Sequence, residues 1–241
     1  IGVDSKTTFN NKIHKCNILN IKKFDKILLK TKPNLVIHLA AQSLVDETIN
    51  KKKYYKNNIV ATTYLLKLMK KNDIKNIIFS STSAVYKISS KPLKENSKLQ
   101  PQSIYAKTKL VCEKNIKRQK NTKHIILRFF NVCSALEKPI IGESHNPETH
   151  LIPTIVYKAI KNKTSYIYGK DFPTPDGTCI RDYIHIKDIC LAIEKSIKFL
   201  LKNKNSATLN IGNSKGLSNH EIINYMQKKL KKKIDIKYVN K

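Results

Sequence analysis

The chain has 241 residues, 40% of them apolar, so it can enclose a hydrophobic core in one large domain with an attached lobe. Its formal net charge is +30, but lysine is spread over nearly every segment, which argues against a dedicated nucleic-acid surface. No apolar run approaches the ~18 residues of a membrane helix, and the five cysteines form no Cys-x-x-Cys pair. We therefore expect a globular, cytoplasmic protein with no specific nucleic-acid or membrane partner.

The chain opens with Ile1-Gly2-Val3-Asp4, which is typical of a strand that ends in an acidic residue. In dinucleotide-binding folds such an acid accepts hydrogen bonds from ribose hydroxyls, whereas a solvated acid near a terminus is the alternative interpretation. The six glycines lie at 2, 142, 169, 177, 212 and 216, so the chain contains no glycine-rich phosphate loop. If Asp4 ends the second strand of such a fold, the first strand and its glycine loop lie upstream.

Three apolar runs, at 35–39, 77–79 and 124–130, predict buried parallel strands. The first run leads into Ala40 and Ala41, small residues that allow a phosphate or ribose to approach the backbone. The second run brings Ser80 and Thr82 to its carboxyl end, the edge at which open α/β sheets bind ligands. His38, inside the first run, is more readily interpreted as a structural residue than as a catalyst. Helices are expected at 54–71, 103–119, 186–201 and 219–230, and a further strand at 208–212.

The segment after Pro101 predicts a helix capped by Ser103, on which Tyr105 and Lys109 share one face. The same Tyr-x-x-x-Lys spacing occurs at Tyr157/Lys161, Tyr166/Lys170, Tyr183/Lys187 and Tyr225/Lys229, where we attribute it to the abundance of lysine. Only the pair at 105 and 109 follows a strand end that carries hydroxyl groups.

This combination resembles the extended short-chain dehydrogenase/reductase superfamily, in which a Ser or Thr at a strand end works with a Tyr-x-x-x-Lys helix on a bound nicotinamide cofactor. Dehydratases of that superfamily typically have Thr-Asp-Glu where this chain has Thr82-Ser83-Ala84. Ser and Ala side chains cannot supply the acid and base needed to expel water. The chain therefore looks most similar to the 4-epimerases of UDP-hexoses. The resemblance implies an α/β fold with a doubly wound, Rossmann-like parallel sheet and a smaller substrate-binding lobe.

The resemblance also implies NAD as the cofactor and assigns catalytic roles. Tyr105 would be the base, and Thr82 would bridge the sugar O4 and the phenol. Lys109 would hold the nicotinamide ribose and, at about 4 Å, lower the pKa of Tyr105 by roughly three units, which brings it near neutrality. Asn17 stands where the family has an Asp that contacts adenine, and Asn58 corresponds to an Asn near the nicotinamide. The implied cofactor-binding residues are Asp4, Asn17, Ile18, Ala40, Ala41, Asn58, Ser80, Tyr105 and Lys109.

Four segments of the second half match the family's substrate-binding segments: the strand end at Asn131, the 142–153 loop, the strand near Tyr168, and 176–185. Arg181 is one of only three arginines, and a planar guanidinium binds a diphosphate in a bidentate way that lysine cannot. The aromatic ring of Tyr168 would stack on uracil. The implied substrate-binding residues are Thr82, Asn131, His150, Leu151, Tyr168 and Arg181.

Glu143, His145, Glu148 and His150 are the residues most easily interpreted as metal ligands. Their spacing follows no recognised zinc pattern, and the family needs no metal. From the sequence we therefore expect no metal site.

We expect an NAD-binding domain at 1–132 plus 181–212 and a substrate lobe at 133–180 plus 213–241. The implied function is NAD-dependent C4 epimerisation of a UDP-hexose, UDP-glucose to UDP-galactose, through a transient 4-keto intermediate. A homodimer through the helices near 54–71 and 103–119 is implied as well. The alternatives are another NDP-sugar epimerase, dehydratase or reductase of the superfamily, or a non-catalytic, basic nucleic-acid-binding member. Both ends look incomplete against the family, so residues 1–241 alone should neither hold NAD tightly nor turn over substrate.

Overall fold

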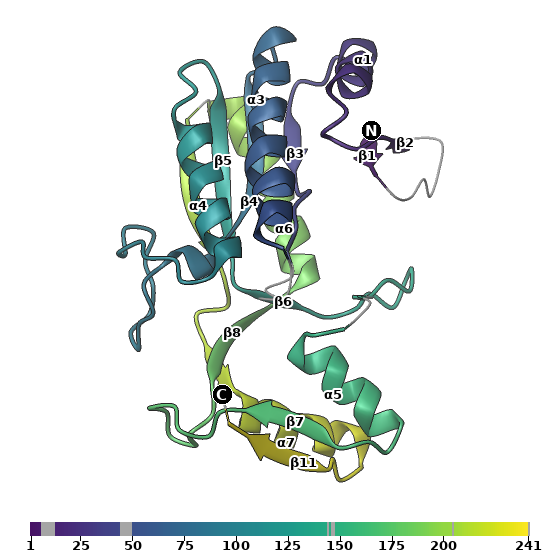
Figure 1. The fold of residues 1–241 in the computed structure, drawn as a ribbon, viewed down its shortest axis with the longest axis vertical. Coiled ribbons are helices and arrows are strands. Elements are labelled where there is room, and N and C mark those ends of the chain that lie inside the picture. Colours follow the sequence, from purple (N-terminus) through teal and green to yellow (C-terminus); the bar gives the residue numbers. More distant parts are fainter. Residues whose placement is uncertain (6–12, 44–49, 144, 146–147, 204, 241) are drawn as a thin grey trace. The chain divides into compact units, whose positions relative to one another are not determined.

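A computed structural model describes residues 1–5, 13–43, 50–143, 145, 148–203 and 205–240. The chain divides into two compact units, 1–129 with 192–210 and 130–191 with 211–241. We describe each unit by itself, with the element labels of Figure 1.

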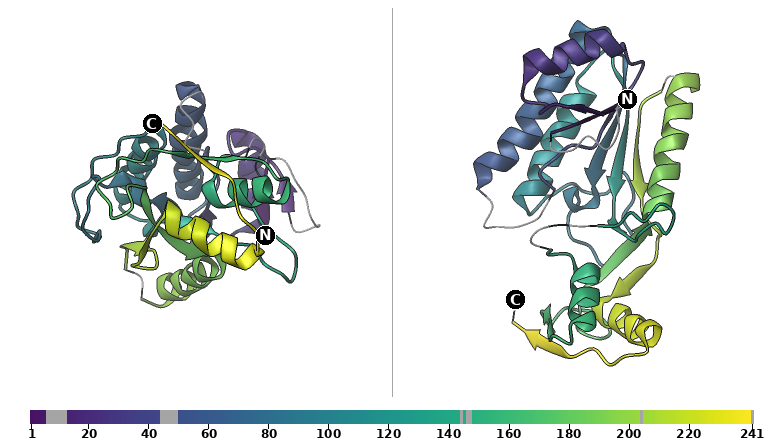
Figure 2. Two further views of the ribbon diagram at one scale, coloured as in Figure 1. Left: turned by 90° about the horizontal axis from the view of Figure 1, so that it is seen from below. Right: turned by 90° about the vertical axis from the view of Figure 1, so that its right-hand side faces the viewer.

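The first unit is built around a four-stranded sheet in the order β3-β4-β5-β9. β3 pairs with β4 and β4 with β5 in parallel, as the apolar runs predict. α3 and α4 cover one face of this sheet and α6 the other, so the sheet is doubly wound (Figures 1 and 2). The strands are β1 Gly2–Asp4, β2 Ile13–Lys15, β3 Val36–His38, β4 Asn76–Thr82, β5 Lys123–Phe129 and β9 Ala207–Ile211. The helices are α1 Ile21–Thr31, α2 Lys51–Tyr54, the π-helix η1 Tyr55–Val60, α3 Ala61–Lys71, the 3-10 turn η2 Ser83–Val85, α4 Ile104–Lys117 and α6 Ile186–Asn203, which enters from the second unit.

The hydrophobic core of the first unit lies between the sheet and its helices. Leu65 and Met69 of α3 meet Ile77 and Phe79 of β4 and Ile126 of β5, and each is at most 1% exposed. Burial on both faces explains why β4 and β5 read as continuous apolar runs rather than as alternating patterns. The fold class expected from the sequence is confirmed.

The helix expected at 54–71 begins earlier and contains a π-turn. Asn50 caps α2 by accepting a hydrogen bond from the Lys52 N–H, which moves the start to Lys51. The π-helix η1 follows, and its wider turn carries Asn58 into the interior, where it is 2% exposed. By contrast, α4 begins where expected, because the Ser103 side chain accepts from the Ala106 N–H.

The second unit contains a three-stranded sheet in the order β10-β8-β6 and a parallel pair β7–β11. Its strands are β6 Asn131–Cys133, β7 Ser165–Tyr168, β8 Ile180–His185, β10 Gly216–Ser218 and β11 Ile236–Val239, and its helices are α5 Leu151–Ile160 and α7 Asn219–Leu230. α5 and α7 pack through Ile155, Ile222 and Met226. The capping box between Ser218 and Glu221 starts α7 at the predicted residue.

The two compact units do not coincide with the expected domains, because residues 130–132, 181–191 and 211–212, expected in the NAD-binding domain, group with the second unit. β8 pairs with β6 and with β10, so it groups with the second unit. Asp182 fixes the return from β9, since its carboxylate accepts hydrogen bonds from the N–H groups of Asn213 and Ser214. A Cβ at Gly212 would lie 2.7 Å from Asp182 Oδ2 and 2.9 Å from Phe130, so only glycine fits this approach. Among the described helices, none is long and apolar enough to cross a membrane.

Candidate active site

The carboxyl end of β4 and the first two turns of α4 bring the predicted catalytic residues together. β4 carries Ser80 and Thr82, while α4 presents Tyr105 and Lys109 on the face toward the sheet. Lys109 is 3% exposed, and its Nζ donates to the Ser80 carbonyl oxygen at 2.5 Å. The ammonium also lies 4.5 Å from the ring centroid of Phe79. The sequence prediction of a hydroxyl, phenol and ammonium group around one strand end therefore agrees with the geometry.

The pKa of Tyr105 departs from the sequence expectation. Burial raises it to about 12, and the hydrogen bond with Thr82 only partly opposes this rise. The expectation that Lys109 brings this pKa near neutrality is therefore wrong for the protein in this state. The reason is geometric: the Lys109 ammonium is directed at Ser80 of β4, while the phenol loses the solvation that would stabilise its anion.

The pKa of Lys109 is also shifted, from 10.5 to about 8. Burial is the largest cause, and the neighbouring Cys112 and Glu113 oppose it. Desolvation therefore shifts both pKa values in the direction that favours the neutral group, upward for the Tyr105 phenol and downward for the Lys109 ammonium. Such paired shifts are typical of functional sites.

A buried ion pair between β5 and α4 lies beside the end of β4. Arg128 of β5 donates through Nε and Nη2 to the two carboxylate oxygens of Glu113 on α4, at 3.0 and 2.7 Å. Ser81 donates to the same carboxylate at 2.5 Å, and Arg128 Nη1 donates to the Tyr86 hydroxyl at 2.7 Å. The sequence analysis missed Glu113. The available signals were an arginine inside an apolar strand run and an acid one turn after Lys109 on the same helix face.

Both polar atoms of the Asn58 side chain form hydrogen bonds within the first unit. Its Oδ1 accepts from the Gln42 N–H at 2.7 Å, and its Nδ2 donates to the Gln42 carbonyl and to Thr108 Oγ1 at 3.2 and 2.9 Å. Asn58 thereby ties the segment after β3 to α4. A direct contact between Asn58 and a cofactor stays a prediction.

His38 is 3% exposed, and its Nε2 lies 2.9 Å from Thr62 Oγ1. Burial, together with the nearby Lys109 charge, lowers its pKa to about 3. A neutral, hydrogen-bonded imidazole fits the structural role expected from the sequence.

The other predicted cofactor residues lie in two places, after β3 and at the ends of the β1–β2 pair. Ala40 and Ala41 follow β3, the strand beside β4. Asp4 ends β1, which pairs with β2 in a separate two-stranded sheet. Asn17 and Ile18 follow β2: the Asn17 side chain accepts from the Leu19 N–H, and Ile18 packs against the core.

The predicted substrate residues of the second unit lie at element ends, and most are exposed. Asn131 opens β6, and Tyr168 ends β7 with 67% of its surface exposed. His150 is the N-cap of α5, and Leu151 is its first residue. Arg181 is exposed in β8, and its Nη1 donates to the Ile180 carbonyl. The four residues interpreted above as conceivable metal ligands, Glu143, His145, Glu148 and His150, come together in the same unit.

Comparison with known proteins adds independent findings. A family model described as NAD dependent epimerase/dehydratase family matches residues 1–212. The chain is 34% identical to a UDP-glucose 4-epimerase of Rhizobium meliloti (strain 1021) over 95% of this chain and 72% of that protein. It is 39% identical to a UDP-glucose 4-epimerase of Lactobacillus helveticus over 84% of this chain, but spans only 63% of that protein. A crystal structure of UDP-glucose 4-epimerase from Brucella ovis in complex with NAD is similar at TM-score 0.92 and 31% identity, covering 99% of this chain and 77% of that one.

Proposed function

We propose, from the chain's membership of the NAD dependent epimerase/dehydratase family, that it catalyses epimerisation at C4 of a UDP-hexose. The reaction would interconvert UDP-glucose and UDP-galactose and would depend on NAD. The observation that carries the proposal is the meeting of Thr82, Tyr105 and Lys109 at one strand end. Ser83 and Ala84 follow Thr82, where a dehydratase would need an acid and a base.

The residues around this strand end fit a nicotinamide cofactor. Lys109 offers a buried ammonium, Ser80 a hydroxyl, and Ala40 and Ala41 a segment without bulky side chains. Asn58 holds the neighbouring backbone in place through Gln42. Bound NAD would accept the hydrogen at C4 as a hydride and return it to the opposite face of the sugar. Asp4, Asn17 and Ile18 are proposed to contact the adenosine end.

Side chains of the protein would remove the proton from the sugar 4-hydroxyl. Tyr105 would take it as the base, with Thr82 bridging the hydroxyl and the phenol, as their mutual hydrogen bond allows. Lys109 would supply the positive charge that favours the phenolate. For this role its ammonium would turn from the Ser80 carbonyl toward the ligand.

The substrate's nucleotide would be held by side chains of the second unit. The exposed Arg181 guanidinium suits a diphosphate, and the exposed Tyr168 ring suits stacking on uracil. Asn131, His150 and Leu151 are proposed as the remaining nucleotide contacts. The preferred sugar is not fixed by these residues, and another NDP-sugar epimerase of the family is the second candidate.

We propose a homodimer formed through the α3 and α4 surface. Tyr55 of the preceding η1 and Val111 of α4 are exposed, 58% and 37%, and a groove is lined by Thr63 and Leu66 of α3 and by Arg118 at the end of α4, among others. A reducing cytoplasm is proposed as the location, because all five cysteines are free and Cys16 and Cys112 are buried.

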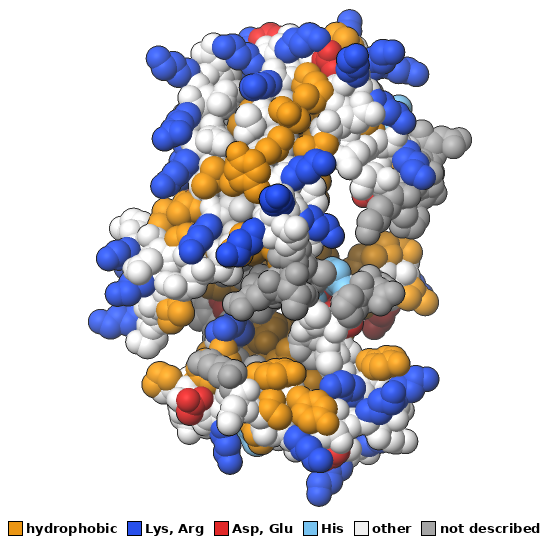
Figure 3. Space-filling model, viewed as in Figure 1, with side chains coloured by type: hydrophobic (Ala, Val, Ile, Leu, Met, Phe, Trp, Pro, Cys, Tyr) orange, Lys and Arg blue, Asp and Glu red, His pale blue; other side chains and the backbone are white. Residues whose placement is uncertain are grey.

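The rival function from another class is nucleic-acid binding through the charge of +30. Figure 3 shows Lys and Arg dispersed over the visible face rather than gathered in one patch, which favours the enzyme. The salt dependence of the affinity distinguishes the two functions, since binding to a nucleic-acid backbone weakens steeply between low and physiological salt. Specific RNA binding that survives physiological salt, in a protein without affinity for UDP, would support the rival.

The test is turnover of UDP-galactose, UDP-N-acetylgalactosamine and a UDP-pentose by the purified full-length protein. Turnover of at least one is expected, and turnover of none would remove the epimerase proposal. Tyr105→Phe should lose at least ~100-fold in kcat because no base remains, while UDP binding stays intact. Tyr157→Phe is the matched control, since Tyr157 has the same spacing to a lysine and is 57% exposed. Equal activity in Tyr105→Phe and the control would refute the assignment of the base.

A further inference from the structure

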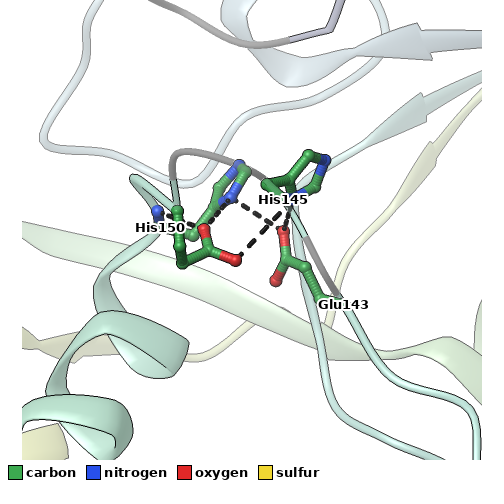
Figure 4. Close-up of side chains that lie close together, drawn as sticks. Glu143, His145 and His150 are labelled. Atoms are coloured by element: carbon green, nitrogen blue, oxygen red, sulfur yellow. Dashed lines mark hydrogen bonds and ion pairs between the residues drawn. The ribbon is translucent and has the colours of Figure 1, made fainter.

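Two imidazoles and two carboxylates converge before α5, in a group we name the Glu–His cluster: Glu143, His145, Glu148 and His150. His150 Nδ1 lies 2.8 Å from Glu143 Oε1 and 2.9 Å from Glu148 Oε1. His145 Nδ1 lies 3.2 Å from Glu143 Oε1 and 3.8 Å from Glu148 Oε2. One potential ligand atom from each of the four side chains lies within 4.8 Å of every other, and the rings face the carboxylates (Figure 4).

Hydrogen bonding alone accounts poorly for this arrangement. One Nδ1–H can be directed at a single acceptor, yet His150 Nδ1 has two carboxylate oxygens at nearly the same distance. Glu143 Oε1 in turn is approached by both rings. Two carboxylate oxygens and two imidazole nitrogens directed at one another form a donor set that a divalent cation at the centre would share.

We propose that the Glu–His cluster is a binding site for a divalent transition metal, and that Zn²⁺ suits it best. Zinc takes imidazole nitrogen at about 2.0 Å and carboxylate oxygen at about 2.1 Å in a tetrahedron, whose ligand atoms lie about 3.4 Å apart. The four nitrogen–oxygen distances in the cluster, 2.8 to 3.8 Å, lie on either side of that value. Two imidazoles argue against Ca²⁺ and Mg²⁺, which take oxygen ligands. This proposal reverses our expectation from the sequence, which judged the residues by spacing alone.

The surroundings of Glu148 prepare it as a ligand. Its Oε1 accepts the backbone N–H groups of Thr149 and His150, each at 2.8 Å, which fixes the direction of the carboxylate. The same oxygen lies 2.9 Å from His150 Nδ1, so the carboxylate is held toward the ring beside it.

The position of the cluster gives the site a structural role. His150 is the N-cap of α5, and Leu151 and Ile152, which open that helix, pack against the core of the second unit. An ion held by four protein ligands has no open position for catalysis and would instead fix the segment that enters α5. The ion would take no part in the proton transfer proposed for Thr82, Tyr105 and Lys109, and with the His150 side chain on the metal, a nucleotide contact at this residue would fall to its backbone.

The test uses full-length protein without a histidine tag, dialysed against Zn²⁺ and then against buffer, with metal content measured by mass spectrometry. One zinc per chain is expected, and Glu143→Gln and His145→Gln should each weaken binding at least ~10-fold in competition with a chromophoric chelator. Glu137→Gln and His14→Gln, which change a carboxylate and an imidazole outside the cluster, should bind like the wild type. Zinc bound equally by all five proteins would place it elsewhere and overturn the proposal.

A second measurement covers variants that fold poorly. Co²⁺ added to the metal-free wild type should give the intense visible absorption of tetrahedral coordination, and a chelator should lower the Tm of the wild type and of Glu137→Gln but not of the cluster variants. A wild type that takes up neither Zn²⁺ nor Co²⁺ at micromolar free metal would also overturn the proposal.

Discussion

Arg128→Met should be among the most damaging single changes in the first unit. The variant leaves the Glu113 carboxylate, 1% exposed, without its cation, and it removes hydrogen bonds of 3.0 and 2.7 Å. It also removes a donor to the Tyr86 hydroxyl. Breaking a buried pair on one side costs about 3 to 5 kcal/mol, because a buried charge is left uncompensated. For a chain of this length that loss lowers Tm by roughly 6 to 20 °C.

Urea denaturation followed by circular dichroism would measure this free energy of unfolding. The double variant Glu113→Leu with Arg128→Met should recover part of the loss, since no unpaired charge then remains. The matched control is Lys198→Met, which breaks an ion pair with Glu194 whose side chains are 67% and 57% exposed and should change stability by less than ~0.5 kcal/mol. A loss below ~1 kcal/mol in Arg128→Met would show that water or another cation reaches Glu113, and the reasoning would fail.

Three further changes test other parts of the fold. Burial lowers the pKa of Lys109 from 10.5 to about 8, so the unfolded chain binds this proton more tightly than the folded chain does. As the pH rises from 8 to 10.5, the free energy of unfolding of the wild type should therefore increase by up to ~3 kcal/mol relative to that of Lys109→Met. A difference independent of pH in urea titrations would contradict this. Ser218→Ala removes the cap of α7 and should cost ~1 to 2 kcal/mol by thermal unfolding, whereas the exposed Ser89→Ala should cost almost nothing. Gly212→Ala should lower Tm by several degrees, because the new methyl group meets Asp182 and Phe130; an unchanged Tm would show that this turn can shift.

Much of the fold could be predicted because local and tertiary preferences agree. The apolar run at 124–130 has one stable solution, a strand buried on both faces, and Ser218 with Glu221 marks a helix start by side-chain chemistry alone. The π-turn at 55–60 could not be predicted, since it depends on where Asn58 finds the backbone of Gln42.

The site was predictable to the same degree. A helical turn relates Tyr105 and Lys109 whatever surrounds them, and a strand end fixes Thr82 nearby. The direction of the Lys109 ammonium depends on the Ser80 carbonyl, which no spacing encodes. The Glu–His cluster lies in an irregular segment without a fixed period, so only the folded backbone shows that its side chains meet.

The pKa of Tyr105 determines when the proposed base can act. Lowering it from about 12 to neutrality requires a stabilisation of the phenolate of about 7 kcal/mol. An ammonium about 4 Å away supplies about 4 kcal/mol, so Lys109 turned toward the phenol would not suffice by itself. The remainder needs a second positive charge of the kind that the oxidised nicotinamide ring carries. Tyr105 is therefore expected to remain a neutral phenol until both charges are beside it, which would confine proton removal from the sugar to the fully assembled site.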